Sequence, residues 1–317
     1  MKKRIKNSCA LFFMGIVFFS CSKETGITPN WPKKSDFAGV GRAYAVAFTI
    51  GSKAYLGTGY NGSLMKDFWE YDPSADSWSQ KSDFGGTART RAVGFSIGAK
   101  GYIGLGYDGT AYKTDMWEYN PQTNSWNQKA TMPAFGRSGA ICFVVGNKAY
   151  AGTGYYYSNP NNYYLKDFWE FYPDSNQWQT IAAFPGTNRY MCSAFSVGSK
   201  GYVGMGLGTQ YNSDFYEYDA SSNSWLQKAN YPTPLSDAAS FSIGGKGYVG
   251  TGYDGGNYTG AFYEYDPASN QWTQKVKFTG STRIDAVGFS VNGKGYICTG
   301  NDGTTQKYRK EVFEYWP

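Results

Sequence analysis

Hydrophobic residues alternate with small ones in short stretches along the chain. In residues 42–51, RAYAVAFTIG, Val46 and Phe48 alternate with alanines, a period of two that is typical of a β-strand packed on one face. A Gly-Ser-Lys turn follows, and three further strands are predicted before the pattern restarts: AYLGTG at 54–59, DFWEYD at 67–72 and SWSQKSDF at 77–84. Each unit therefore predicts a sheet of four short antiparallel strands.

This unit recurs along the whole chain. The tryptophans of the fourth strand lie 48, 52, 47 and 47 residues apart: Trp78, Trp126, Trp178, Trp225 and Trp272. The glutamate of the third strand occurs six times: Glu70, Glu118, Glu170, Glu217, Glu264 and Glu314. One such sheet cannot bury both of its faces, whereas sheets packed radially can. The repeats predict an all-β fold, a six-bladed β-propeller of four-stranded antiparallel blades.

The two ends of the chain hold complementary parts of one unit. The last copy stops at VFEYWP, residues 312–317, without its fourth strand, whereas NWPKKSDF at 30–37 is a fourth strand without a unit. We therefore predict that the N-terminal segment completes the last blade and leaves no exposed sheet edge at the seam. Trp31 should then lie beside Phe313 and Tyr315.

The repeated motif resembles the kelch repeat. It consists of an arginine before the first strand, then G-x-K-x-Y-x-G-x-G-Y, then E-Y-D-P-x-[ST]-N-x-W. The resemblance covers residues 31–317, with one departure: Gly-x-Gly, as in Gly57-Thr58-Gly59, stands where kelch repeats have adjacent glycines. It implies a propeller of the superfamily that includes the central domain of galactose oxidase. Kelch propellers outside the cytoplasm include sialic-acid mutarotases, so the resemblance also allows a carbohydrate-active enzyme of a mutarotase or epimerase type.

The first 21 residues differ from the repeats. MKKRIKN is basic, and CALFFMGIVFF is an apolar run of 11 residues, too short to span a bilayer. The run ends at SCS, where Cys21 follows a small residue, and this arrangement resembles a bacterial lipoprotein signal. We predict a signal peptide at 1–20, a lipidated Cys21, a linker at 21–30 and the propeller at 31–317. An ordinary cleaved secretory signal is the alternative.

Composition and charge narrow the expected partners. Glycine accounts for 41 of the 317 residues and aromatic residues for 19%, which suits many short strands and tight turns. Residues 1–20 contain four of the 30 basic residues and none of the 24 acidic ones, so 26 basic and 24 acidic residues remain. Because the net charge of the remaining chain is close to zero, we expect no nucleic-acid partner. We expect a monomer that is anchored to the outer membrane only by its lipid, on the periplasmic side or at the cell surface.

The chain contains no histidine, which excludes several kinds of site. The copper site implied by the galactose oxidase resemblance uses two histidines and a tyrosine linked to cysteine, so copper oxidase activity is excluded. Histidine-dependent hydrolysis and histidine-bound zinc are excluded in the same way. Cys142, Cys192 and Cys298 lack the spacing of metal ligands, and we predict small buried residues there. We expect no metal and no cofactor.

Two sets of side chains are predicted to surround one mouth of the central channel. In an antiparallel blade, the start of the first strand and the end of the second lie at the same face. Arginines stand before the first strand in five units: Arg42, Arg89, Arg137, Arg189 and Arg283. Tyrosines follow the second strand in four: Tyr60, Tyr107, Tyr155 and Tyr253. Such groups suit an anionic or sugar ligand, through bidentate hydrogen bonds and stacking. A structural role in bonding loops between blades is the alternative for the arginines, and both roles stay open for the tyrosines.

The third unit departs from the repeat in the loop after its second strand, YYYSNPNNYYLK. Exposed tyrosines on a lengthened loop indicate a contact surface. We predict that Tyr155, Tyr156 and Tyr163 bind a glycan or an envelope protein. A lengthened loop without a partner is the alternative.

The fifth and sixth units carry acidic residues near the mouth. Leu235 replaces the arginine of the fifth unit and Asp237 follows two residues later, while Asp285 holds the same position in the sixth. Period two places both carboxylates on the same side of neighbouring inner strands, where a pair can do acid–base work on a sugar. Solvated charges at the mouth are the alternative. Three further aspartates precede glycines and are predicted to form turns, with calcium binding as the alternative: Asp108, Asp254 and Asp302.

Together these features predict a non-catalytic propeller at the cell envelope that binds a glycan or a protein partner. A carbohydrate-active enzyme is the alternative. No motif transfers a catalytic residue from the kelch resemblance, so Asp237 and Asp285 are the only catalytic candidates.

Overall fold

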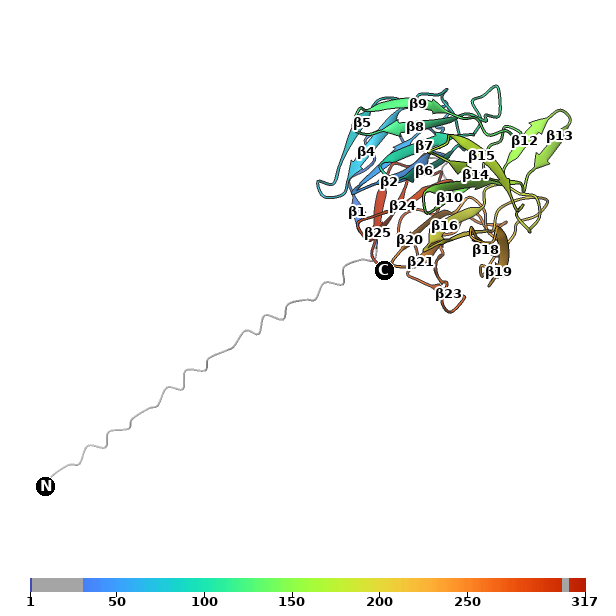
Figure 1. Ribbon diagram of the computed structural model, residues 1–317. Coiled ribbons are helices and arrows are strands. Elements are labelled where there is room, and N and C mark those ends of the chain that lie inside the picture. Colours follow the sequence, from blue (N-terminus) through green and yellow to red (C-terminus); the bar gives the residue numbers. More distant parts are fainter. Residues whose placement is uncertain (2–30, 304–307) are drawn as a thin grey trace.

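The computed structural model describes Met1 and residues 31–303 and 308–317. The described chain forms six sheets of four strands and a separate two-stranded hairpin, with no helix. Figure 1 shows the six sheets arranged around a central axis as the blades of a propeller. The predicted fold class is therefore confirmed. No described segment forms a helix of the length and apolar character needed to cross a membrane.

Each blade runs outward from the axis, from an innermost strand to an outermost one. From the axis outward, blade 1 contains β2 (Val46–Ile50), β3 (Lys53–Gly57), β4 (Phe68–Asp72) and β5 (Ser77–Lys81). Blade 2 contains β6 (Val93–Ile97), β7 (Lys100–Gly104), β8 (Met116–Asn120) and β9 (Ser125–Lys129). Blade 3 contains β10 (Ile141–Val145), β11 (Lys148–Gly152), β14 (Phe168–Tyr172) and β15 (Gln177–Ile181).

The other three blades follow the same outward order. Blade 4 contains β16 (Ser193–Val197), β17 (Lys200–Gly204), β18 (Phe215–Asp219) and β19 (Ser224–Lys228). Blade 5 contains β20 (Ala239–Ile243), β21 (Lys246–Gly250), β22 (Phe262–Asp266) and β23 (Gln271–Gln274). Blade 6 contains β24 (Val287–Val291), β25 (Lys294–Cys298), β26 (Val312–Tyr315) and β1 (Lys33–Lys34). The hairpin of β12 (Tyr155–Ser158) and β13 (Asn161–Tyr164) projects from blade 3 (Figure 1).

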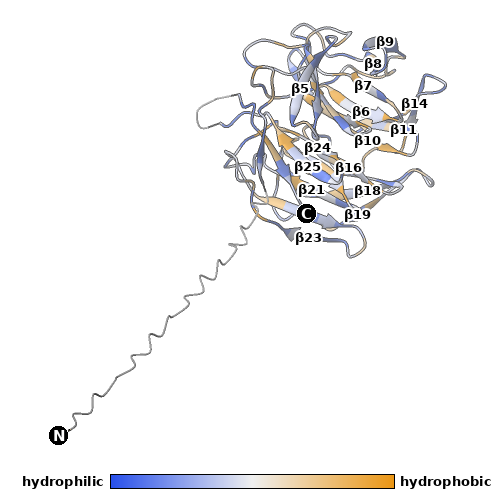
Figure 2. Ribbon diagram, turned by 90° about the vertical axis from the view of Figure 1, so that its left-hand side faces the viewer, coloured by the Kyte–Doolittle hydropathy of each residue, from blue (hydrophilic) through white to orange (hydrophobic). Residues whose placement is uncertain are grey.

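The innermost strands explain the alternation of hydrophobic and small residues. In β2, Val46, Phe48 and Ile50 are buried, whereas Ala47 and Thr49 are half-exposed and line the axial channel. Figure 2 shows hydrophobic residues along the inner strands of the blades. The Phe48 ring lies over Gly101 of blade 2, so close that a Cβ on this glycine would lie 2.2 Å from a ring carbon. Glycine here lets the two blades approach until the ring fills the space between them.

The seam of the ring closes as the sequence predicts. β1 pairs antiparallel with β26, with Lys33 opposite Phe313, and Glu314 donates a backbone hydrogen bond of 2.9 Å to the Pro32 carbonyl. Trp31 is 2% exposed, and its ring centroid lies 4.8 Å from that of Tyr315. Residues 2–30, which hold the predicted signal peptide, Cys21 and the linker, lie outside the described residues.

The repeated glutamates have a structural partner in every blade. Each accepts a hydrogen bond of 2.6–2.9 Å from the hydroxyl of a tyrosine on the second strand: Tyr55–Glu70, Tyr102–Glu118, Tyr150–Glu170, Tyr202–Glu217, Tyr248–Glu264 and Tyr296–Glu314. These bonds satisfy a buried phenol between the second and third strands. The glutamates therefore belong to the scaffold.

Candidate functional site

The five arginines before the inner strands are fully buried, each 0% exposed: Arg42, Arg89, Arg137, Arg189 and Arg283. Arg89 shows the arrangement. Its guanidinium donates bidentate hydrogen bonds of 2.6 and 2.8 Å to Asp115, another of 2.9 Å to the Leu105 carbonyl, and lies 4.8 Å from the centre of the Phe84 ring. Phe84 follows β5, the fourth strand of the preceding blade, so the arginine joins two blades.

Three other arginines form the same bidentate pair with their own aspartates: Arg42–Asp67, Arg137–Asp167 and Arg189–Asp214. In blade 6, Arg283 and Glu311 form an ion pair of 3.6 Å, which is longer than a hydrogen bond. In blade 5 both members of the pair are apolar, because Leu235 and Ala261 stand at the two positions. A paired replacement is what a structural ion pair requires, since either charge alone would lack its partner. The geometry of these arginines is that of the structural alternative, and with no exposed area they present nothing to a ligand at the mouth.

The mouth itself is built two residues further along the chain. One residue of each blade forms a ring around the axis: Tyr44, Arg91, Gly139, Met191, Asp237 and Asp285. All six adopt the left-handed conformation, with φ between 53° and 61°. Each backbone N–H donates to the carbonyl of the ring residue in the neighbouring blade, at 2.9–3.3 Å, and the sixth bond closes the circle. The rim is therefore a rigid loop of hydrogen bonds, and its side chains line a cavity of about 170 Å³.

Four of the rim side chains form a polar cluster. Asp285 and Asp237 are neighbours in the ring, joined by a backbone hydrogen bond of 3.0 Å, and the Ser236 hydroxyl donates to Asp237 at 2.5 Å. The Arg91 guanidinium lies over the ring of Tyr44, 4.3 Å from its centre. Two buried atoms of the cluster, Asp285 Oδ2 and Arg91 Nε, have no hydrogen-bond partner among the residues that the structure describes. Both residues line the same cavity, so this cavity has an unused acceptor and an unused donor in its wall.

The charged side chains of the cluster shift one another's pKa values. Burial, and then the neighbouring Asp237 carboxylate, raise the pKa of Asp285 well above its usual range. Burial opposes the charge on Arg91, but Asp285, Tyr44 and Asp237 outweigh it and raise the pKa of the guanidinium. Burial raises the pKa of Tyr190, which precedes the rim residue of blade 4, to about 12. The floor of the mouth therefore holds a carboxyl group that retains its proton to higher pH than usual, next to a fixed cation.

Tyrosines form a wall above this floor. The four expected from the sequence are half-buried there: Tyr60, Tyr107, Tyr155 and Tyr253. Others that the sequence did not single out join them, and the ring centroids lie 4.8–6.0 Å apart in these pairs: Tyr60–Tyr308, Tyr107–Tyr112, Tyr112–Tyr155, Tyr155–Tyr190, Tyr211–Tyr253 and Tyr253–Tyr258. Burial raises the pKa values of Tyr211, Tyr258 and Tyr308, and the charge of Asp237 or Asp285 adds to each rise, so these phenols lie near the acidic pair.

Comparison with known proteins places this architecture in a family. Residues 40–206 match the family described as the KLHDC2/KLHL20/DRC7 Kelch-repeats domain. The chain is a kelch-repeat protein. A solved structure, titled "Structure of YjhT", is similar with a TM-score of 0.73 at 16% sequence identity, over 90% of this chain and 96% of that one. This likeness concerns the fold alone. No curated protein matches the sequence.

Below the mouth, the axial channel of the kelch propeller is narrow and lined by small residues. Its walls include alternate residues of the innermost strands: Ala47, Gly94, Cys142, Ala194, Ser240 and Gly288. Cys142 is half-buried here, whereas Cys192 and Cys298 are buried, and none of the three forms a disulfide within the described part of the chain. The channel carries no charged side chain among these lining residues, so polar chemistry at the axis is concentrated at the mouth.

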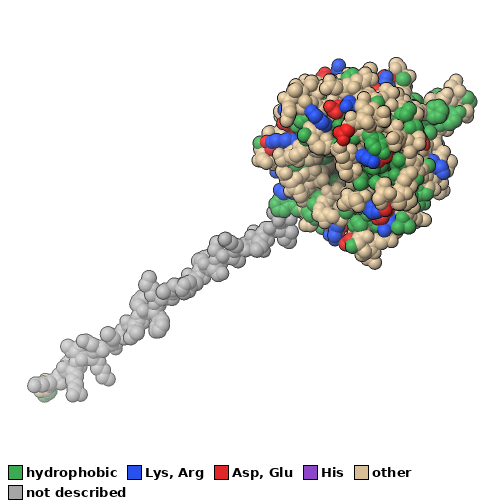
Figure 3. All heavy atoms as spheres, in the orientation of Figure 1, with side chains coloured by type: hydrophobic (Ala, Val, Ile, Leu, Met, Phe, Trp, Pro, Cys, Tyr) green, Lys and Arg blue, Asp and Glu red, His purple; other side chains and the backbone are tan. Residues whose placement is uncertain are grey.

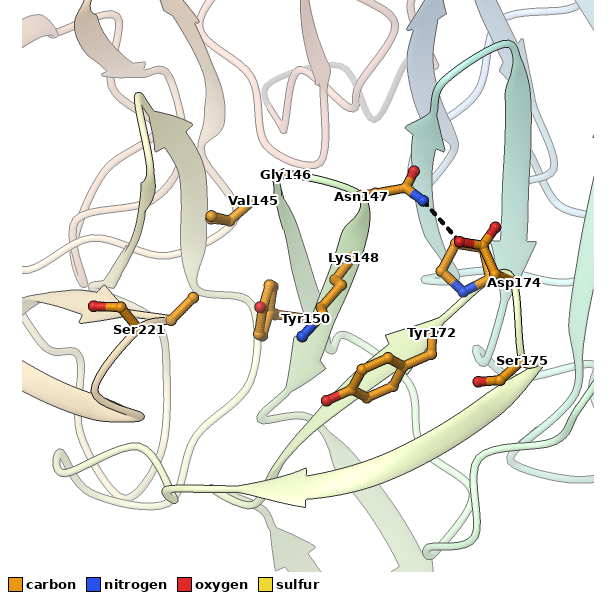
Figure 4. A pocket seen from close by; sticks show the side chains of 11 residues that line it. Val145, Gly146, Asn147, Lys148, Tyr150, Tyr172, Asp174, Ser175 and Ser221 are labelled. Atoms are coloured by element: carbon orange, nitrogen blue, oxygen red, sulfur yellow. Dashed lines mark hydrogen bonds between the residues drawn. The ribbon is translucent and has the colours of Figure 1, made fainter.

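A second cavity, of about 550 Å³, lies between blades 3 and 4 at the end opposite the mouth (Figure 4). Its polar side chains bond to one another or to nearby residues. Lys148 pairs with Glu170 at 2.9 Å and stacks on Tyr172, and Asn147 donates to Asp174 at 3.3 Å. Because its charged groups already have partners, this cavity offers a ligand less than the mouth does.

The acidic pair was among the residues selected from the sequence, whereas Tyr44, Arg91 and Tyr190 were not. A signal for them was present. The position two residues after each strand-leading arginine holds a different side chain in almost every blade of the kelch propeller, although the residues around it repeat. A position whose residue varies between blades, while its neighbours repeat, is one that the propeller fold does not require to hold a particular side chain. The Asp-Gly turns behave as expected, since Asp108 and Asp254 each accept backbone hydrogen bonds within their own loops.

Proposed function

We propose that this kelch propeller binds a neutral carbohydrate at the axial mouth, with Arg91, Asp237 and Asp285 on the floor and tyrosines as the wall. One observation carries the proposal: Arg91, Asp237 and Asp285 line one cavity, and the buried Arg91 Nε and Asp285 Oδ2 have no hydrogen-bond partner among the described residues. A sugar offers hydroxyl groups that donate and accept at once, and apolar faces that stack on phenol rings. The Arg91 guanidinium faces the acidic pair in this cavity, and opposite charges side by side favour a ligand without strong net charge.

Binding to a glycan array, followed by titration calorimetry, tests this proposal. We expect Arg91→Ala and Asp285→Ala each to weaken sugar binding by at least tenfold, because a site built around a hydroxyl leaves buried polar groups unpaired without it. Lys148→Ala, at the opposite end of the propeller, serves as the matched control and should bind as the wild type does. A blank array, or equal affinities in all four proteins, would overturn the proposal.

A carbohydrate-active enzyme of the mutarotase or epimerase type is a second candidate, and the raised pKa of Asp285 favours it. A neutral carboxyl group can donate a proton to a sugar oxygen while a neighbouring carboxylate accepts one from a hydroxyl, and Asp285 and Asp237 are adjacent. NMR measurement of the interconversion of N-acetylneuraminate anomers tests this candidate. An unchanged rate with the wild-type protein would exclude mutarotation of that sugar.

The proposal includes attachment to the bacterial cell envelope through a lipid on Cys21. It is supported by the basic and apolar sequence before this cysteine, which lies outside the described residues. We expect Cys21→Ser to move the protein from the membrane fraction to the soluble fraction of cells that express the full chain. An envelope protein that binds at the mouth in place of a glycan would appear in pull-downs that Asp285→Ala abolishes.

A further inference from the structure

The hairpin of β12 and β13 carries aromatic side chains on both of its faces. Cross-strand partners and alternate residues share a face, so Tyr155, Tyr157, Asn162 and Tyr164 lie on one side of the hairpin. The hydrogen bond of 2.7 Å from the Tyr155 hydroxyl to Asn162 agrees with this assignment. Figure 3 shows the hydrophobic and aromatic side chains gathered over this projection.

This face continues the wall of the mouth. The rings of Tyr155 and Tyr164 lie 5.3 and 5.5 Å from that of Tyr190, and the two lie 5.6 Å from each other. Tyr190 in turn precedes the rim residue Met191. Tyr157 stands two residues beyond Tyr155 on the same face, roughly 7 Å further out along the strand, and is 47% exposed. An aromatic surface therefore runs from the floor of the mouth to the outer part of the hairpin.

The opposite face holds the hairpin in place. Tyr156 is sandwiched between Phe135 and Tyr163, with ring centroids 5.2 and 4.7 Å apart and planes within 20° and 8° of parallel. Phe135 belongs to the link between blades 2 and 3, so this three-ring column fastens the hairpin to its neighbour. A surface that is fixed before binding loses little entropy when it meets a ligand.

The chemistry of the hairpin favours an uncharged occupant. Residues 155–164 comprise five tyrosines, three asparagines, a serine and a proline, with no charged side chain. Phenol rings and amide groups match the apolar faces and the hydroxyl groups of a sugar, whereas a charged peptide would find no partner. The acceptor oxygen of Asn162 is used by Tyr155, which leaves the amide N–H groups of Asn162 to donate beside Tyr157.

We propose that the ligand is an oligosaccharide, one end of which sits at the mouth while the following units run outward over Tyr155, Tyr164 and then Tyr157. This inference rests on the proposed function and extends it from a single sugar to a chain. The distance from Tyr155 to Tyr157 corresponds to about one additional sugar unit. Tyr157 is thus the outermost contact, and it acts on chain length rather than on the unit at the mouth.

Titration calorimetry with three homologous series tests the inference: β-1,4-linked glucose, N-acetylglucosamine and mannose, each from one to six units. In at least one series we expect the wild type to bind four units at least fivefold more tightly than one. Tyr157→Ala should lose that gain and keep the affinity for the single unit within twofold, whereas Tyr157→Phe should keep both. Ser158→Ala is the control, because Ser158 is exposed on the other face of the same hairpin and lies outside the three-ring column.

The outcomes separate this inference from the function on which it rests. Wild-type binding of single sugars without any gain from chain length would overturn the inference alone. Absence of all sugar binding would overturn the proposed function as well. A gain lost in Ser158→Ala but kept in Tyr157→Ala would place the sugar chain on the other face of the hairpin and overturn the inference. An envelope protein retained by the wild type and lost by Tyr157→Ala, without a length effect, would assign the face to a protein and contradict the inference.

Discussion

Replacing the Arg89–Asp115 pair by the residues of blade 5 tests whether the buried arginines hold the propeller together. Arg89→Leu removes a fully buried guanidinium that makes two hydrogen bonds to Asp115 and one to the Leu105 carbonyl. Removing one partner of a buried pair costs about 3–5 kcal/mol, because the other charge stays behind uncompensated. At about 2 °C per kcal/mol for a chain of this length, the melting temperature should fall by roughly 6–10 °C.

The double variant Arg89→Leu/Asp115→Ala reproduces the combination of Leu235 and Ala261, which the fold already accepts in blade 5. It should recover at least half of the loss, since replacing both charges removes the uncompensated carboxylate. The two single variants, the double variant and the wild type complete a thermodynamic cycle, with an expected coupling of about 2 kcal/mol. Calorimetric melting and sugar titration of all four proteins provide the readouts. An Arg89→Leu variant that melts like the wild type but binds sugar less tightly would show that the arginine serves the ligand instead.

Two further predictions concern the seam and the acidic pair. Trp31→Ala should destabilise the propeller by about 3–5 kcal/mol, because the indole is 2% exposed and contacts Phe262, Phe278 and Tyr315; a variant that melts like the wild type and stays monomeric in size-exclusion chromatography would contradict the closure. Burial and Asp237 raise the pKa of Asp285 in the folded protein. The unfolded chain releases this proton above about pH 3.9, whereas the folded protein still holds it. The free energy of unfolding of the wild type therefore falls as the pH rises from about 3.9 to the pKa of the folded protein. Asp285→Asn stays neutral, so its melting temperature relative to wild type should rise between pH 4 and pH 7; a difference that is the same at both pH values would refute the raised pKa.

The propeller fold could be predicted from the sequence because the pattern of the kelch unit recurs six times along the chain. Alternation in the inner strands and the misplaced fourth strand at residues 30–37 predict the blades and the seam, and the structure confirms both. The arginines show where such reasoning stops. Their position before the inner strand predicts the correct face, but the direction of the side chain depends on Asp67 and its counterparts, some 25 residues away along the chain.

The mouth was harder to predict for a related reason. The rim residues adopt a left-handed backbone, which turns each side chain away from the direction that strand periodicity implies. Asp237 and Asp285 could be predicted because the fifth unit, which holds Asp237, lacks the arginine of the repeat. Tyr44 and Arg91 lie in units that keep this arginine. The additional tyrosines come from loops whose paths are set by packing between blades and not by local pattern.

A crystal structure of the full propeller with the tightest-binding sugar from the array tests the central claim most directly. The account predicts electron density at the axial mouth, with sugar hydroxyl groups within hydrogen-bond distance of the Arg91 guanidinium and the Asp285 carboxyl group and a sugar face against the tyrosine wall. Density confined to the opposite end, at the cavity beside Lys148 and Tyr172, would contradict it.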